Sequence, residues 1–226
     1  MNTFNSLDQL NEIFYADRQM RKQYSEQASA MINKIKSQLP INGNKILSLS
    51  RSWLSIELES SGNNVKVLPT AIDPNERFSM ILAVDELLTR ESDEANQKRI
   101  ISQLFSMLEP GGILLASLRD YKNTNCHRRP LGDSTFSLIG KDHYVITEVN
   151  ELDINDKQRW YQKFHVVKND IDFCCLEVGA RRTLYFKQLA KYCADAGAPE
   201  FGMISDGYWR NHLRRTPEHM VYARVA

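Results

Sequence analysis

The sequence lacks the features that would place it in a membrane, a zinc-binding fold or a disulfide-stabilised scaffold. It contains no run of about 18 apolar residues, the length that a membrane-spanning helix requires. Its N-terminus is mixed and partly acidic, unlike a signal peptide. The four cysteines show no CxxC spacing, so neither a disulfide framework nor a zinc site is expected. We therefore expect a cytoplasmic protein with no membrane partner.

An excess of charge of one sign is also absent. The net charge is +1 over 226 residues, so no global field attracts nucleic acid, and no nucleic-acid partner is expected. The five histidines are scattered and none is paired at metal-ligand spacing, so no metal site is expected. An apolar content of 42% and a charged content of 25% are typical of a soluble globular protein of one domain, with or without a small appendage.

The apolar pattern predicts an α/β protein. In residues 6–38, apolar side chains recur at helical spacing, which predicts one broken helix or two consecutive helices that end before Pro40. Between residues 45 and 121, strand-like runs such as "FSMILAV" and "ILLASLRDY" alternate with helix-like runs. Nearly continuous apolar runs are typical of strands that are covered on both faces. The alternation predicts a mostly parallel sheet with helices on both faces.

The pattern changes in the last third of the chain. The runs "DHYVITEVNELD", "RWYQKFHVV" and "DFCCLEVGA" predict the strands of an antiparallel meander, with turns at Asn155-Asp156 and Asn169-Asp170. Cys174 and Cys175 are expected on opposite faces of the third of these strands. A helix is predicted in "LYFKQLAKYCADAG" and a final strand in "HMVYARV".

Four stretches of the chain resemble the class I S-adenosylmethionine-dependent methyltransferases of the small-molecule type. They are "KILSLSRSWLSIELES", "RFSMILAVDELL", "LFSMLEPGGILLASLRDY" and "RRTLYFKQLAKYCADAGA", and together they cover most of residues 45–226. The resemblance implies a Rossmann-like, seven-stranded sheet with an antiparallel C-terminal hairpin. It also implies that S-adenosylmethionine binds over the carboxyl ends of the early strands and that its methyl group passes in line to a small-molecule substrate.

The resemblance divides the chain into an N-terminal helical cap, residues 1–40, and a methyltransferase-like α/β domain, residues 41–226. The cap would form a lid or a substrate wall, with Tyr15 and Tyr24 as candidate substrate contacts. Packing of both tyrosines on the inner face of a helix is the alternative.

The first loop of the resembled family contains an acidic residue and three glycines, and this chain has none of them. Ser48 takes the acidic position, and Ser50, Ser52 and Leu54 take the glycine positions. Glycine allows a tight turn and a close approach of the backbone to a ligand, so each added side chain is expected to take space from the cofactor. Hydroxyls of the three serines are candidate cofactor contacts. Arg51 adds positive charge at a helix start, where an anion would be favoured.

A second difference is the length of the next connection. Only ten residues, 68–77, separate the strand "NVKV" from the strand "FSMIL", so one βα unit of the family is missing. Asp73 is the acidic candidate for a ribose contact. The Asp73-Pro74 pair is also typical of a turn, which is the alternative.

The remaining candidates follow the ends of predicted strands. Val84 and Asp85 are candidate cofactor contacts at the end of "ILAV". Arg119 is a candidate clamp for a substrate carboxylate or phosphate, and Asp120 and Tyr121 after it are candidate catalytic residues. A salt bridge and a packed tyrosine at the strand end are the alternative. His143 is the histidine that we would test as a base.

Three functional interpretations stay open at this stage. The first is an active small-molecule methyltransferase with a remodelled loop. The second is a catalytically inactive pseudo-methyltransferase that binds a protein partner or forms a homodimer. The third is a scaffold that binds an anionic ligand at the Arg51 helix start. Because one fold hosts many functions, the fold alone does not decide among them.

Overall fold

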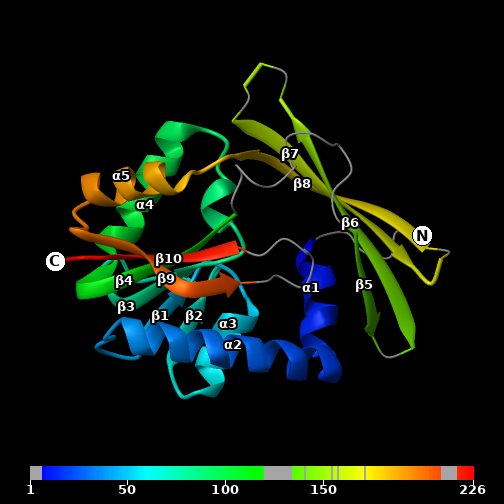
Figure 1. The fold of residues 1–226 in the computed structure, drawn as a ribbon, viewed down its shortest axis with the longest axis horizontal. Coiled ribbons are helices and arrows are strands. Elements are labelled where there is room, and N and C mark those ends of the chain that lie inside the picture. The colour runs from blue at the N-terminus through cyan, green and yellow to red at the C-terminus, as the bar shows by residue number, and fades with distance from the viewer. Residues whose placement is uncertain are drawn as a thin grey trace.

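The computed structural model describes residues 7–119, 134–139, 141–153, 155–156, 158–170, 172–209 and 218–226. The helices in these residues are α1 (Leu7–Ala16), α2 (Arg18–Gln38), α3 (Trp53–Ser60), α4 (Glu94–Ser106) and α5 (Phe186–Asp195), with a 3-10 turn η1 at Leu87–Thr89. The strands form a larger and a smaller sheet (Figure 1).

The larger sheet confirms the predicted α/β architecture. Its spatial order is β2 (Asn64–Val67), β1 (Lys45–Ser48), β3 (Phe78–Ala83), β4 (Leu108–Arg119), β10 (Glu218–Arg224) and β9 (Glu200–Trp209). The first four strands are parallel, and β10 is antiparallel to both β4 and β9, as expected for a C-terminal hairpin. Among the described residues this sheet has six strands rather than the seven of the resembled family. The connection from β2 to β3 contains neither helix nor strand, which agrees with a missing βα unit.

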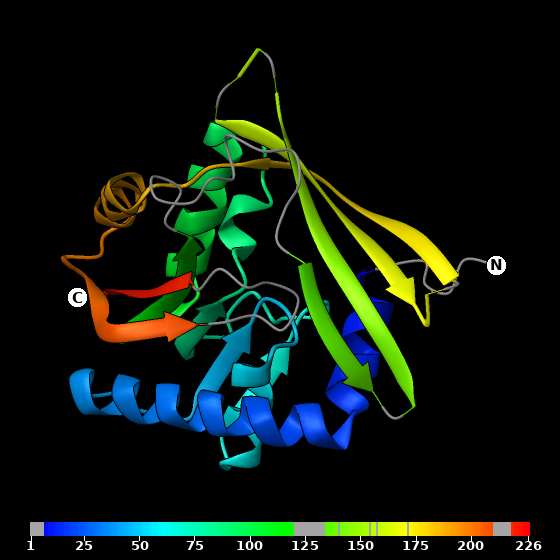
Figure 2. The same ribbon diagram turned by 45° about the vertical axis from the view of Figure 1, so that its right-hand side comes forward.

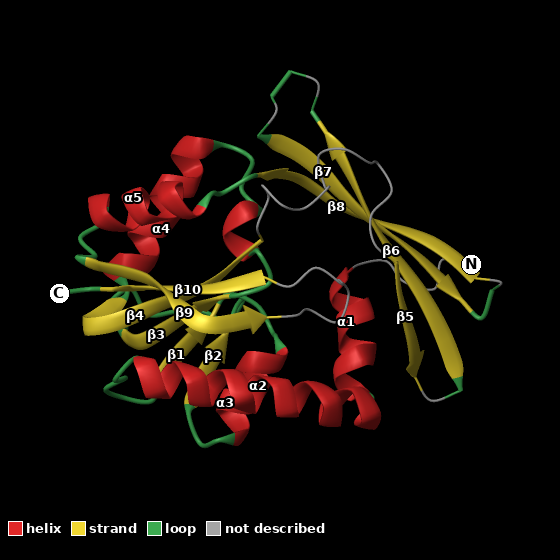
Figure 3. Ribbon diagram, in the orientation of Figure 1, coloured by secondary structure: helices red, strands yellow, loops and turns green. Residues whose placement is uncertain are grey.

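Helices cover both faces of the larger sheet (Figures 1 and 3). All six residues of β3 are buried, because apolar side chains of the strand meet a helical layer on each side. On one face, α4 and α5 contribute Ile101, Leu104 and Leu189 to the core. On the other face, α2 and α3 contribute Met31 and Leu54.

The smaller sheet stands beside the larger one (Figure 2). Its order is β5 (Ser134–Ile139), β6 (Asp142–Leu152), β7 (Arg159–Lys168) and β8 (Asp172–Arg182), and all its pairs are antiparallel. The predicted meander is thus confirmed, with β5 as an additional strand. Cys174 is buried and Cys175 is exposed, as the alternation of a strand requires. The inner face packs against α1, where the rings of Phe14 and Tyr144 lie 6.0 Å apart.

The two N-terminal helices have different positions, although we expected them together in a cap. Asp17 separates them, because its side chain accepts a hydrogen bond from the backbone N–H of Met20 and starts α2. α2 lies along the face of the larger sheet beside α3, and α1 stands between the two sheets. Only α1 therefore has the position of a lid or wall. In the part of the chain that the structure describes, no helix combines the length and apolar character needed to cross a bilayer.

Glu76 closes the short connection between β2 and β3. Its two carboxylate oxygens lie 3.1 Å from Lys45 Nζ on β1 and 2.7 Å from Lys66 Nζ on β2. The hydrogen bond from Lys66, together with that from Lys45, holds the pKa of the Glu76 carboxyl below its ordinary value of 4.5. The connection is thereby held against β1 and the edge strand β2.

We predict that Glu76→Gln destabilises the protein at neutral pH and that this loss shrinks in acid. A carboxyl whose folded-state pKa is lowered contributes stability above its ordinary pKa, and the contribution disappears as pH falls through the lowered value. Urea unfolding of wild type and Glu76→Gln at pH 7 and below pH 4.5 measures the difference. Glu26→Gln, a change on the exposed face of α2, is the control. A free-energy difference that stays constant with pH would contradict the ion-pair assignment.

Candidate functional site

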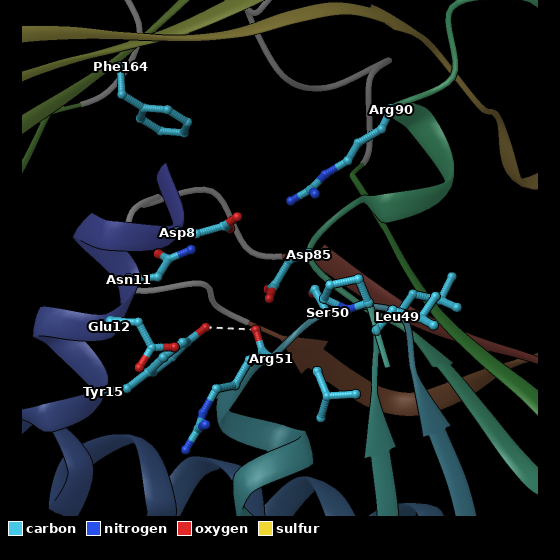
Figure 4. Close-up of a pocket in the computed structure, with 13 residues that line it drawn as sticks. Asp8, Asn11, Glu12, Tyr15, Leu49, Ser50, Arg51, Asp85, Arg90 and Phe164 are labelled. Atoms are coloured by element: carbon cyan, nitrogen blue, oxygen red, sulfur yellow. Dashed lines mark hydrogen bonds between the residues drawn. The ribbon is translucent and has the colours of Figure 1, made fainter. Parts of the chain in front are cut away.

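A cavity of about 370 Å³ opens at the carboxyl ends of β1, β2 and β3 (Figure 4). Its walls come from α1, from the loops after these three strands and from the smaller sheet. The lining residues are Asp8, Asn11, Glu12, Tyr15, Leu49, Ser50, Arg51, Val67, Leu68, Pro69, Asp85, Arg90 and Phe164. Below, this cavity is called the crevice.

Two serines of the glycine-free loop stabilise the loop itself. The Ser48 hydroxyl donates a 2.6 Å hydrogen bond to the backbone carbonyl of Ser50. Ser52 is the N-cap of α3 and forms a reciprocal capping box with Ser55, in which each side chain accepts from the backbone N–H of the other. Ser48 and Ser52 are buried outside the crevice lining, so Ser50 alone of the three predicted serines forms part of the wall.

Side chains at two of the three glycine positions point into the protein rather than into the crevice. Leu54 is fully buried in the core between α2, α3 and the larger sheet, and Ser52 is buried at the helix cap. The side chains of Ser52 and Leu54 therefore occupy no space in the crevice itself. The crevice persists because the polypeptide turns into α3 with these side chains on the core side.

Three aromatic rings pack together at the start of α3, next to the same loop. The ring of Trp53 stacks on Tyr24 with centroids 5.3 Å apart, and Tyr15 meets it edge-on at 4.8 Å. Tyr24 is thus a buried packing residue outside the crevice lining. Tyr15 lines the crevice and donates a 2.9 Å hydrogen bond to the backbone carbonyl of Arg51. Burial, followed by the nearby Asp85 carboxylate, raises the pKa of Tyr15, so its hydroxyl stays a neutral donor.

One face of α1 forms the acidic wall of the crevice. Asp8, Asn11, Glu12 and Tyr15 follow one another at helical spacing and all face the cavity (Figure 4). Together with Asp85 on the opposite side, they bring three carboxylates to one space. Arg51 and Arg90 are the two arginines of the lining, but only Arg90 directs its guanidinium toward Asp85, because the Arg51 side chain runs away from it below Tyr15 (Figure 4). The crevice therefore suits a ligand that carries positive groups and a smaller negative group.

Asp85 enters the crevice from an unusual backbone conformation. Asp85 and Glu86 have φ angles of 62° and 56°, in the left-handed region that non-glycine residues rarely adopt. The Asp85 carboxylate accepts a 2.8 Å hydrogen bond from Nε1 of Trp209 on β9. Val84, predicted as a cofactor contact, is instead fully buried in the core next to Asp85.

Arg119 lies in a buried ion cluster rather than in the crevice wall. Its terminal nitrogen is 3.1 Å from Oε2 of Glu86 and 3.0 Å from Oε1 of Glu148, which also accepts a hydrogen bond from Gln162. The side chains of Glu86, Arg119 and Glu148 are at most 5% exposed. The predicted role of Arg119 as a substrate clamp is not favoured, because its guanidinium is occupied within the protein.

The other predicted residues are not brought to the crevice. Asp73 is exposed in a turn, where its carboxylate accepts a 2.8 Å hydrogen bond from the backbone N–H of Asn75. His143 lies at the β5–β6 hairpin, with Nε2 3.1 Å from the Asp170 carboxylate. Asp120 and Tyr121 lie outside the described residues. Within the described ranges, no group of three or more His, Cys, Asp or Glu side chains could hold a metal ion.

The acidic face of α1 and the two carboxylate partners of Arg119 were not predicted from the sequence. Glu148 gave a usable signal, because it shares the inner face of β6 with the apolar Tyr144 and Ile146, where a charge must have a partner. For Asp8 and Glu12, the spacing was visible in the sequence, but an acidic helix face is ordinarily solvated.

Comparison with known proteins shows a likeness in structure alone. No family model and no curated protein matches the sequence. DesVI from Streptomyces venezuelae superposes with a TM-score of 0.67 at 10% identity, over 99% of this chain and 100% of that one. An amino pentose methyltransferase of calicheamicin biosynthesis from Micromonospora echinaspora was solved with SAM bound. It superposes with a TM-score of 0.61 at 11% identity, over 100% of this chain and 99% of that one. A sugar N-methyltransferase from Streptoalloteichus superposes with a TM-score of 0.62 at 10% identity, over 100% of this chain and 95% of that one.

We predict that Ser52→Ala lowers the free energy of unfolding by about 1 kcal/mol, the usual effect of removing a helix N-cap. Ser50→Ala is the matched control, because Ser50 accepts the hydrogen bond from Ser48 with its backbone carbonyl, which the substitution retains. Chemical denaturation of both variants measures the two effects. Equal losses of unfolding free energy in Ser52→Ala and Ser50→Ala would show that the helix cap does not stabilise the loop.

Proposed function

On a chain with a class I S-adenosylmethionine-dependent methyltransferase-like fold, we propose that the crevice binds S-adenosylmethionine and that the protein methylates an amine of a small molecule. The observation that carries the proposal is the crevice itself. It lies outside the carboxyl ends of three parallel strands, which is where open α/β sheets bind ligands. Its volume of about 370 Å³ falls within the usual range for a small-molecule pocket.

The lining offers groups for the charged end of this cofactor. The carboxylate of Asp85 is suited to its positive groups, and the guanidinium of Arg90 is suited to its carboxylate (Figure 4). Bound there, the cofactor would supply an electrophilic methyl group on a sulfonium. Ser50 leaves room beside it, since its neighbours Ser48 and Ser52 turn their hydroxyls into the loop.

The acidic wall of α1 favours an amine as the methyl acceptor. Asp8 and Glu12 attract a cationic group to the mouth of the crevice, and Phe164 on β7 presents an aromatic ring on the same side (Figure 4). Two of the structural relatives act on an amino pentose and on a sugar nitrogen, which supports the same class of acceptor.

Positioning accounts for most of what the residues have to do. Methyl transfer is a displacement in line, so the walls must hold the two reactants close and aligned. An amine is a nucleophile only without its extra proton, and the carboxylate of Asp8 or Glu12 is the group that accepts that proton. The neutral Tyr15 hydroxyl holds the loop carbonyl of Arg51 in place meanwhile.

One observation favours a second candidate, a methyltransferase-like binding protein without transfer activity. At the end of β2 the crevice is lined by Val67, Leu68 and Pro69, so the lining offers no carboxylate to a ribose at this strand end. The missing βα unit also leaves the adenine side of the site without its usual element. A ligand smaller than a nucleoside would then occupy the crevice.

We predict that S-adenosylhomocysteine and S-adenosylmethionine both raise the unfolding temperature. A ligand at 100 times its dissociation constant adds about 2.7 kcal/mol to stability. Ser50→Phe should abolish the shift by filling the crevice, whereas Ser37→Phe, exposed at the end of α2, should retain it. Asp85→Asn should lower the affinity for S-adenosylmethionine more than the affinity for S-adenosylhomocysteine, because only S-adenosylmethionine carries the sulfonium charge.

The same samples can test transfer. Release of S-adenosylhomocysteine in the presence of a panel of small primary and secondary amines should exceed that in their absence, and Ser50→Phe should remove the difference. No thermal shift with either compound at millimolar concentration would reject the proposal. Binding without turnover would favour the second candidate.

A further inference from the structure

Two consecutive left-handed residues aim Asp85 at the crevice. Each such non-glycine conformation costs roughly 1–3 kcal/mol and persists only where the surrounding structure enforces it. Asp85 is partly exposed to the crevice and has the Trp209 indole as its partner. Glu86 is completely buried. The constraint that holds the pair must therefore act mainly through Glu86.

Glu86 is held at its side chain and at its backbone. Its carboxylate lies 3.1 Å from the terminal nitrogen of Arg119 on β4. Its N–H donates to Ser117 Oγ at 3.3 Å, and Ser117 in turn donates to the buried carboxylate of Glu218 on β10. Its carbonyl accepts from Thr89 Oγ1 at 2.7 Å and from a terminal nitrogen of Arg181 at 3.4 Å. No rotation of this residue is possible without breaking several buried contacts at once.

The ion pair of Glu86 determines to which side of the turn the side chains of Glu86 and Asp85 point. A buried charge cannot leave its partner for water without a large penalty, so Arg119 fixes where the Glu86 carboxylate must lie. Because the carboxylate is fixed on the buried side, the adjacent peptide turns the Asp85 side chain to the opposite, crevice side. Glu148 holds the same guanidinium from β6 but has no covalent link to Asp85.

We propose that Glu86 is a positioning residue: its ion pair with Arg119 enforces the left-handed turn that places the Asp85 carboxylate in the crevice. The inference rests on the proposed function in that Asp85 is a ligand-binding group there. Removal of the charge, as in Glu86→Gln, lets the turn relax toward ordinary backbone angles. Asp85 then withdraws from the crevice and from the Trp209 indole.

The test is the indole N–H resonance of Trp209 in the absence of any ligand. The chain has three tryptophans, and Trp209→Phe assigns the signal. In Glu86→Gln we expect the Trp209 indole proton to move upfield and to exchange with solvent about tenfold faster, as for the loss of one hydrogen bond. The indole proton of Trp53, which packs against Tyr15 and Tyr24, should be unchanged.

Glu148→Gln is the matched control, because it removes the other carboxylate from Arg119 without touching the turn. It should lower stability and leave the Trp209 resonance in place. If Glu86→Gln does not fold, Arg119→Lys, which keeps the charge and shortens its reach, should give the same upfield shift. An unmoved Trp209 signal in a folded variant of Glu86 or Arg119 would overturn the proposal, and so would an equal shift in Glu148→Gln.

Ligand binding provides the second readout. If S-adenosylhomocysteine binds, Glu86→Gln should lower the affinity for it about fivefold. Adding Glu86→Gln to Asp85→Asn should lower the affinity no further, because both changes act through one carboxylate. Additive losses would overturn the positioning role. Absence of ligand binding in the wild type would reject the proposed function alone, since the resonance of Trp209 is measured without ligand.

Discussion

The buried Arg119 guanidinium joins the two sheets of this protein. It extends from β4 and contacts Glu86 at the end of β3 and Glu148 on β6, all three almost fully removed from solvent. Loss of the Arg119 guanidinium would cost about 3–5 kcal/mol, because the two carboxylates would stay buried without compensation. This contact and the apolar core around Phe14 and Tyr144 together join the two sheets, and Phe164 on β7 reaches the crevice at this junction.

The crevice shows how a loop without glycine can still leave space for a ligand. Glycine permits close approach because it has no side chain. Here the same space is retained because the side chains of Ser48, Ser52 and Leu54 are directed into the protein, where two make hydrogen bonds and one packs in the core. The capping box of Ser52 and Ser55 stabilises the tight turn into α3, which glycine residues would otherwise make possible through their backbone freedom.

Much of the fold could be predicted from the sequence, but less of the site. Continuous apolar runs and strict alternation report burial on two faces or on one, so β3 and the strand containing Cys174 were recognisable. Of the candidate residues, Tyr15, Ser50 and Asp85 do line the crevice. Arg119 and Asp73 do not, because a charged residue at a strand end or in a loop looks the same in sequence whether it meets a ligand, a buried partner or solvent.

Except for β5, the sequence by itself determined the order of strands and helices, the missing βα unit and the faces that had to be buried. These features follow from local periodicity and from the length of connections. Only the tertiary structure decided which charges meet. Glu86, Arg119 and Glu148 are distant in sequence, and their pairing depends on the packing of one sheet against another. The same packing turns the acidic face of α1 toward Asp85, since the direction of a side chain across an interface is set by the elements on both sides of it.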